Sequence, residues 1–421
     1  MNGSGFYGWR VVAAAFVLAV FGWGIGFYGP PVYLHAVREA RGWPVSLVSA
    51  AVTAHFLVGA VVIANLPGLY RRLGLPRVTK AGAALMSLGV AGWALAAEPW
   101  ELFAATLLSG AGWVAMGAAA INAIVSPWFV RARPAALATA YNGASIGGVI
   151  FSPLWVAAIA GIGFPEAAAA IGAVTTATVW LLADRVFACT PERMGQAPDG
   201  DMAGGPPATM TSPCARPLPG RQLWRDLRFL TLAAGMALGL FAQIGLIAHL
   251  FSLLVPALGP QLAGIAAGLS TAAAIGGRSV VGWLMPVGAD RRLVAGLSYA
   301  VQIAGAVAFL LAAGESVPLL ILGVVLFGAG IGNATSLPPL IAQVEFVKED
   351  VSRVVPLIVA IGQGTYAFAP AVFGLGRELL PTPAVFIGAA IIQALAIVAL
   401  LVGRRRTETL QIPLAQQADR P

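Results

Sequence analysis

Charge is scarce in this sequence. Of its 421 residues only 10% are Asp, Glu, Lys or Arg, whereas 59% are hydrophobic. Soluble domains carry about 25% charged residues, and a water-exposed surface cannot be built from far fewer. The composition therefore excludes a soluble enzyme and a soluble nucleic-acid-binding protein. Twelve membrane spans of about 21 residues would fill about 60% of the chain, which matches its hydrophobic share. We predict a polytopic membrane protein.

Side chains that bind metals and loops that bind nucleotides are scarce too. The chain has three histidines and two cysteines, Cys189 and Cys214, with no histidine near either cysteine. This pattern indicates no zinc site, and one pair of cysteines does not establish a disulfide. Neither a G-x-x-x-x-G-K-[ST] loop nor an H-E-x-x-H motif occurs. ATP-driven pumping and zinc proteolysis thus have no support, and we expect no metal and no cofactor.

One enzyme-like pattern is present, the G-x-S-x-G of hydrolases at residues 143–147. That motif needs a sharp strand-to-helix turn and a triad histidine and acid. Here it falls inside an apolar stretch expected to be helical, and no acidic residue lies at its depth. We therefore expect no enzymatic activity.

Hydropathy predicts an all-α membrane protein with twelve transmembrane helices. The predicted spans are 11–34, 45–70, 80–97, 101–128, 135–160, 166–183, 227–254, 261–286, 293–313, 317–341, 354–376 and 382–403. A polar stretch rich in Pro and Gly separates the sixth span from the seventh. The expected organisation is therefore a six-helix half at 1–183, a cytoplasmic linker at 184–226, a second six-helix half at 227–403 and a cytoplasmic tail at 404–421.

The two halves repeat each other's motifs. Gly110-Ala111-Gly112 recurs as Gly328-Ala329-Gly330, and PGLYRRL at 67–73 recurs as PVGADRRL at 286–293. Such repeats predict two pseudo-symmetric, parallel halves related by an axis along the membrane normal. In this arrangement the substrate binds between the halves at mid-depth.

The basic residues predict the orientation. Among 25 Lys and Arg residues, only Arg38, Arg41 and Arg377 fall on the side opposite the termini, and Arg278 falls within a span. The positive-inside rule then places both termini in the cytoplasm. The charge of +8 is thus a topology signal that also favours anionic lipid headgroups, not nucleic acid. Short loops without sorting signals favour a bacterial inner membrane, and we expect a monomer.

Arg278 is the only charged residue that this assignment places deep inside a span. A charge at mid-bilayer costs at least about 2.5–3.5 kcal/mol, so intramembrane arginines usually serve a function. No acidic residue occurs within a span to neutralise it. A guanidinium binds a carboxylate through a bidentate fork, which points to a small organic anion as substrate. The alternative is a structural arginine that ties helix-end carbonyls.

Other polar residues fall at a similar depth. We interpret five of them as further substrate contacts, because tyrosines and amides can donate to a carboxylate that Arg278 holds. These are Tyr28, Asn142, Gln243, Gln363 and Tyr366. His55 and Asn122 are expected to bind only neighbouring helices. His249 could couple protons to transport, or it could lie near the outer end of its span.

The twelve spans and the Arg-Arg loops after spans 2 and 8 resemble the major facilitator superfamily. Its loop motif G-x-x-x-D-R-x-G is partly kept: aligned on Gly74, Pro67 and Arg71 replace the first Gly and the Asp, and Arg72 remains. The resemblance implies that the cytoplasmic loops with Arg72, Arg291 and Arg292 take part in gating.

Within that superfamily, YGWR at 7–10 and the pair Gly277-Arg278 followed by GWL at 282–284 resemble the monocarboxylate and oxalate:formate porters. The resemblance implies that Arg278 binds the substrate carboxylate. Two positions depart from it. Ala274 stands where proton symporters often have Asp, and Gln363 stands where the oxalate:formate exchangers have a lysine.

One fixed positive charge suits one negative charge, so we expect a monocarboxylate transporter that works by alternating access. Transport by exchange, facilitated transport, and proton coupling through His249 or the substrate all remain open. The alternatives are an exporter of drugs or other neutral compounds on the same fold, or a dicarboxylate exchanger of the oxalate:formate type.

Overall fold

The computed structural model describes residues 6–200, 220–286 and 289–404, and within them the secondary structure is helical, with no strand. The first half contains α1 (Gly8–Gly26), α2 (Pro30–Arg41), α3 (Val45–Leu73), α4 (Leu75–Leu95), α5 (Pro99–Met116), α6 (Ala118–Val125), α7 (Arg133–Ile162) and α8 (Phe164–Leu182). The second half contains α9 (Gly220–Leu223), α10 (Leu227–Leu284), α11 (Arg291–Ala312), α12 (Val317–Glu345), α13 (Lys348–Tyr366), α14 (Ala369–Leu379) and α15 (Pro383–Val402).

Eleven helical segments of the described chain are long and apolar enough to cross a membrane. One of them, α10, has 58 residues, which at about 1.5 Å per residue gives about 87 Å. This is almost three times the hydrocarbon thickness of about 30 Å. Gly259 (φ 72°, ψ 164°) breaks its helical geometry between Pro256 and Pro260. The stretch therefore contains the seventh and eighth spans, and the predicted twelve-span fold is confirmed.

Three predicted spans are each divided in two. The first breaks between α1 and α2 ahead of Pro30 and Pro31, the fourth breaks at the extended Gly117, and the eleventh breaks ahead of Pro370. Proline lacks an N–H and glycine tolerates unusual backbone angles, so these residues interrupt helices that hydropathy alone treats as continuous. The last break has a consequence: α14 extends to Leu379 and includes Arg377.

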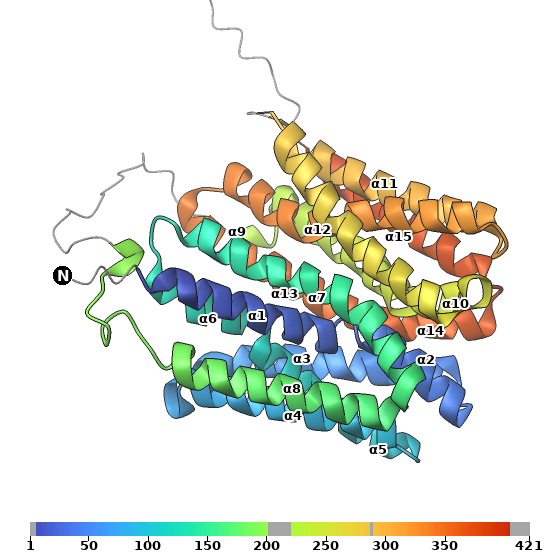
Figure 1. The fold of residues 1–421 in the computed structure, drawn as a ribbon. Helices are drawn as coiled ribbons and strands as arrows, with labels where there is room; N and C mark the ends of the chain where they lie inside the picture. The colour runs from blue at the N-terminus through green and yellow to red at the C-terminus, as the bar shows by residue number, and fades with distance from the viewer. Residues whose placement is uncertain (1–5, 201–219, 287–288, 405–421) are drawn as a thin grey trace, which may run out of the picture.

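The two halves lie side by side. In Figure 1, α11, α12 and α15 lie along one side of the bundle and α4, α5 and α8 along the other. Within the first half, α1 packs on α7 and α4 packs on α5 and α8; within the second, α10 and α11 pack on α12 and α15. The halves meet mainly through three helix pairs, α7 with α10, α3 with α14, and α2 with α10.

The repeated glycines occupy equivalent places in the two halves. A Cβ at Gly110 of α5 would overlap the backbone carbonyl of His55 in α3, and one at Gly328 of α12 would overlap the carbonyl of Ser270 in α10. Gly110 allows the helices of spans 4 and 2 to contact each other closely, and Gly328 does the same for spans 10 and 8, as small residues do in membrane bundles. The repeat seen in the sequence thus reflects the same packing contact in each half.

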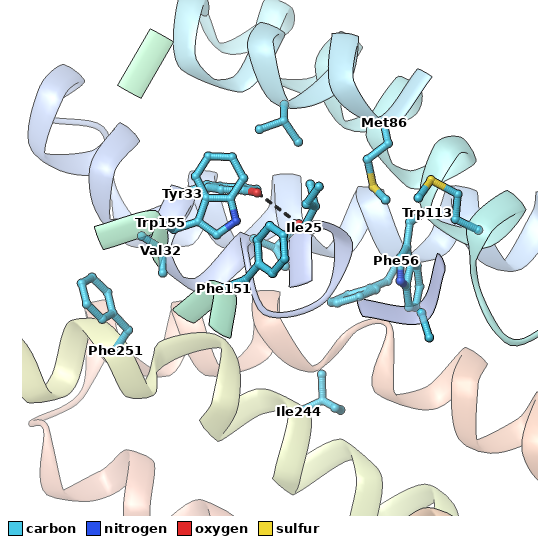
Figure 2. Packing of buried hydrophobic residues seen from close by; sticks show 14 of the residues in the cluster. Ile25, Val32, Tyr33, Phe56, Met86, Trp113, Phe151, Trp155, Ile244 and Phe251 are labelled. Carbon is cyan, nitrogen blue, oxygen red and sulfur yellow. Dashed lines mark hydrogen bonds between the residues drawn. The ribbon is translucent and has the colours of Figure 1, made fainter. Parts of the chain in front are cut away.

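The core of the first half is aromatic. Figure 2 shows Tyr33, Trp155 and Phe151 packed together, with the Tyr33 hydroxyl donating to the Ile25 carbonyl at 3.2 Å. The same buried cluster extends to Phe251 of α10 in the second half. The hydrophobic core is therefore shared across the interface between the halves.

Part of the polar segment after α8 is bound to the first half. The Asp199 carboxylate accepts from the backbone N–H groups of Val130, Arg131 and Ala132 at 3.1, 2.8 and 3.2 Å. The Gln196 side-chain oxygen accepts from the Tyr7 N–H at 3.0 Å. The segment thus contacts both the start of α1 and the loop before α7.

Candidate functional site

The interface between the halves is closed at one end of the bundle, which we call the kinked end because Gly259 lies there. The Thr53 hydroxyl of α3 accepts from the Ala371 N–H of α14 at 3.1 Å. The Glu378 carboxylate of α14 accepts from the Ser46 N–H at 3.1 Å. These bonds join the start of α3 to α14, which lies with α2 at the right-hand end of Figure 1.

Two further contacts close the kinked end. Gly264 and Gly268 of α10 face Val156 and Pro153 of α7 so closely that a Cβ would crowd them. The His35 ring of α2 stands edge-on to Phe251 of α10, with centroids 5.1 Å apart. At the other end α13, the first part of the span that α14 completes, barely contacts α3. The halves are therefore joined at the kinked end and only weakly joined at the end where α1 and α10 begin.

Tyr28 and Arg278 lie at this interface, one from each half. Tyr28 follows α1 at the break before α2, and Arg278 is on the second segment of α10. The Tyr28 hydroxyl interacts with the Thr271 hydroxyl and electrostatically with the Arg278 guanidinium. Gly148 of α7 packs directly against both Tyr28 and Thr271. The break in the first span thus aims Tyr28 across the interface.

The Arg278 guanidinium has an unused bidentate face. Its Nε donates to the Gly332 carbonyl at 3.2 Å, which fixes the side chain against α12. Within the described residues both Nη atoms lack a hydrogen-bonding partner, and no carboxylate lies within 4.0 Å. A guanidinium that is held by one bond through Nε and has both Nη atoms free can donate hydrogen bonds to an oxyanion. A small cavity of about 20 Å³ beside Tyr28, lined by Ser152 and Ser270 among others, leaves room for about one water in this conformation.

Aromatic side chains surround Tyr28. Phe27 stands edge-on to Tyr28 with centroids 5.0 Å apart, and it also packs on Phe56 of α3 at 6.0 Å. Tyr366 of α13 crosses from the second half to meet Phe56 at 5.9 Å. Tyr366 therefore lies in the same interfacial region as Tyr28 and Arg278. Phe56 and Thr271 were missed from the sequence, although Thr271 lies two helical turns before Arg278 and so shares its face.

Gln243 does not lie with this group. It is 2% exposed, inside the second half, and its side-chain oxygen accepts from Gln302 at 3.3 Å. Gln302 in turn accepts from Gln393 at 2.8 Å. The three amides link α10, α11 and α15, so the structure gives Gln243 a role in helix packing in place of the predicted substrate contact. Hydropathy gave its depth but not the face of the helix on which it lies.

Asn142 and Gln363 are more accessible. Asn142 is exposed on α7 and Gln363 is half-buried on α13. Neither side chain has a hydrogen bond to another described residue, so both remain predictions. His55 fits the expected packing role, since its ring nitrogens bind Ser109 and the Gly26 carbonyl, both at 2.9 Å. Asn122 accepts from Ser126 in the next turn at 2.8 Å.

His249 is fully buried and both ring nitrogens are engaged. Nε2 donates to the Pro370 carbonyl at 3.0 Å, so Nδ1 is the acceptor for Arg377 Nη1 at 3.2 Å. A proton on Nδ1 would meet a guanidinium, which is unfavourable for the proton-coupling role predicted from the sequence. Arg377, which the sequence places just beyond the eleventh span, lies in the last turn of α14, and its side chain is half-buried.

The predicted gating arginines differ from one another. Arg292 is 1% exposed and its guanidinium binds both Glu345 oxygens at 2.6 and 2.8 Å. Arg291 donates to the Leu340 carbonyl at 2.6 Å, whereas Arg72 is exposed. Arg292 therefore pins the start of α11 to the end of α12. The sequence did not reveal this pair because Glu345 is far from Arg292 along the chain.

Comparison with known families decides the identity. The model described as Major Facilitator Superfamily matches residues 12–370. The chain belongs to the major facilitator superfamily. It is therefore a multi-pass membrane transporter rather than an enzyme. No curated protein matches it significantly by sequence.

Solved structures of the superfamily share its fold. A mutant of the nucleoside transporter NupG has a TM-score of 0.74 at 13% identity, covering 94% of this chain and 100% of that one. Another NupG structure has a TM-score of 0.71 at 14% identity, with coverage of 96% and 99%. A bacterial homolog of the human lysosomal transporter Spinster, inward-facing and occupied, has a TM-score of 0.63 at 14% identity, with coverage of 95% and 97%. At these identities the likeness shows the fold alone.

Proposed function

We propose that this transporter carries a small organic monocarboxylate, with Arg278 binding the carboxylate and Tyr28 donating a second hydrogen bond. The observation that supports this is the free fork of Arg278, which faces Tyr28 of the other half and has no carboxylate partner in the described chain. The resemblance of the Arg278 region to monocarboxylate and oxalate:formate porters supports the same substrate class.

An anion at this point contacts both halves at once. Because Arg278 belongs to the second half and Tyr28 to the first, a bound carboxylate is held best when the two are close. A ligand shifts a conformational equilibrium by its differential affinity for the two states. Substrate binding at this pair therefore favours conformations in which the halves approach each other, as alternating access requires.

The basic residues support a cytoplasmic location for the end where both termini lie. Under that assignment the kinked end faces outward and is closed, and the structure is inward-facing. The same reasoning supports a bacterial inner membrane and cytoplasmic termini, and we propose a monomer in contact with anionic lipid.

The competing substrates are testable together. NupG, of the same fold, is a nucleoside transporter, and an exporter of neutral compounds would not depend on Arg278. The experiment is a panel in proteoliposomes that contains lactate, pyruvate, benzoate, oxalate and uridine. Wild type is compared with Arg278→Gln, Arg278→Lys and the exposed-arginine control Arg72→Gln.

We expect uptake of monocarboxylates, its loss in Arg278→Gln, and strongly weakened uptake in Arg278→Lys, because lysine keeps the charge but not the fork. Unchanged uptake in both Arg278 variants would contradict the site. A strong preference for oxalate would contradict a monovalent substrate, and uridine as the only substrate would contradict the anion class.

A further inference from the structure

A second arginine without a counter-ion lies at the kinked end of the interface. Arg377 reaches from α14 to α10, where Nη1 donates to the Ser252 hydroxyl at 2.6 Å and to His249 Nδ1 at 3.2 Å. Both partners are neutral, and no carboxylate of the described residues lies within 4.0 Å of it. Its Nε and Nη2 have no hydrogen-bonding partner in the same part of the chain. A half-buried charge without a counter-ion carries a desolvation cost.

The facing surface of the other half is also basic. Arg377 interacts electrostatically with Arg38 and His35 of α2. Two carboxylates lie near this group. Glu39 is 71% exposed and lies 3.4 Å from His35 Nε2, and the exposed Glu378, next to Arg377 in α14, accepts from the Ser46 N–H. His35 Nδ1 is buried and has no hydrogen-bonding partner among the described residues. The kinked end therefore brings Arg377 and Arg38 together while neither carboxylate binds Arg377, which leaves its free donors available.

We propose that Arg377 forms a second anion site, distinct from Arg278, that binds the carboxylate of a small organic anion when the halves separate at the kinked end. His249 is a positioning residue that orients Arg377 through Nδ1. The proposal rests on the proposed function, because it takes the same substrate class. With the kinked end closed, Arg377 lies against α10 and within electrostatic reach of Arg38 and His35 of α2; when the halves separate there, its free Nε and Nη2 become accessible to an anion.

We call the kinked end the gate, and its separated state the open gate. Separation of the halves there frees the space beside Nε and Nη2 of Arg377, so an anion bound at these atoms favours the open gate. Gate opening is therefore the direct readout of this site. Spin labels at Ser46→Cys and Leu379→Cys, an exposed position at the end of α14, straddle the gate and leave the Glu378 carboxylate in place. They report gate opening as a distance distribution in a background of Cys189→Ser and Cys214→Ser. Lactate is the probe, and chloride at equal ionic strength is the control anion.

Lactate is expected to shift the distribution toward the open gate in wild type and still do so in Arg278→Gln. In Arg278→Gln combined with Arg377→Gln, the lactate concentration for half the shift should rise at least about tenfold, as expected for losing a hydrogen bond from a charged donor. Arg377→Lys should retain a weaker response, and Arg41→Gln, an exposed arginine at the end of α2, should leave it unchanged.

Three results would overturn the proposal: no lactate response in Arg278→Gln although wild type responds, an unchanged response after Arg377→Gln, or an equal response to chloride. A merely structural role for Arg377 would change the distribution without lactate but not the lactate dependence. Failure of the proposed function is seen separately, as wild-type protein that transports no carboxylate.

Discussion

Tyr28 and Arg278, from opposite halves of the bundle, interact across the interface in the part of the structure where α7 packs against α10. Tyr28 reaches this point because the first span breaks before Pro30, and Arg278 does so because Gly332 fixes its Nε. In the proposed function, this pair makes the interface itself the binding site for the anion. Each half contributes one donor, so neither half alone can hold the anion as tightly.

Tyr28→Phe removes one hydroxyl and keeps the ring that packs on Phe27. Losing one hydrogen bond is expected to weaken carboxylate affinity by about 2–10-fold. Substrate binding measured by calorimetry on purified protein checks this. The matched control is Tyr33→Phe, whose hydroxyl binds the Ile25 carbonyl away from the interface; it should lower the unfolding temperature and leave affinity unchanged. Equal affinity loss in both variants would contradict a contact with the substrate.

The fold was predictable from the sequence to a larger extent than the site. Local composition indicates the number of spans, the recurrence of the Gly110 motif at Gly328 and the break beside Tyr28. It does so because membrane insertion constrains the length and polarity of each segment. The exact end of the helix near Arg377 could not be predicted from the sequence. Pro370 starts a new helix that continues beyond the point where hydropathy predicts the end of the span.

Which way a polar side chain points could not be predicted. Gln243, His249 and Arg278 all lie within apolar stretches, yet the first binds Gln302, the second binds Arg377 and only the third keeps two nitrogens without a partner among the described residues. These differences depend on contacts between helices distant in the chain. Depth is encoded locally, whereas partner choice depends on tertiary packing.

Gly148 is expected to be essential for closing the kinked end. A Cβ there would overlap both Tyr28 and Thr271, so Gly148→Val should hold the halves apart and abolish transport while leaving the protein folded. Gly161→Val on the same helix is the control, because a Cβ there meets nothing within 4 Å. The measurement is uptake together with the spin-label distance across the gate. A closed gate and normal uptake in Gly148→Val would contradict this prediction.

Arg292 and Glu345 are expected to stabilise the second half. Removing one partner of a buried ion pair costs about 3–5 kcal/mol, because the other charge is left uncompensated. Arg292→Ala should therefore lower the thermal unfolding midpoint strongly in detergent. Asp184→Asn, which breaks the exposed pair with Lys80, should cost about 0–1 kcal/mol. If both variants unfold at the wild-type temperature, the Arg292 pair is not a stabilising one.

The Asp199 contact should persist across neutral pH and fail in acid. Burial raises the pKa of Asp199, but three backbone N–H bonds and the nearby Arg131 outweigh this effect and bring the pKa below its usual value. A carboxyl whose folded pKa is lowered stabilises the fold above its unfolded pKa of about 3.9, and this contribution is lost as pH falls through the lower, folded value. Hydrogen exchange at residues 130–132 should thus be slow at pH 5–7 and faster in Asp199→Asn. Equal exchange in both proteins would contradict the contact.

Variants of His249 can distinguish a positioning role from a role in proton transport. Glutamine offers one acceptor and one donor, so His249→Gln can satisfy Arg377 and the Pro370 carbonyl without titrating. We expect carboxylate uptake to stay within about threefold of wild type with the same pH dependence, as for exchanging one set of hydrogen bonds for another. His249→Ala, which leaves Arg377 without its acceptor, should reduce uptake more. Uptake driven by an imposed proton gradient and by substrate exchange is the measurement. If His249→Gln abolished only the gradient-driven uptake, the proton would pass through His249. The assignment of His249 as a neutral positioning residue would then be wrong.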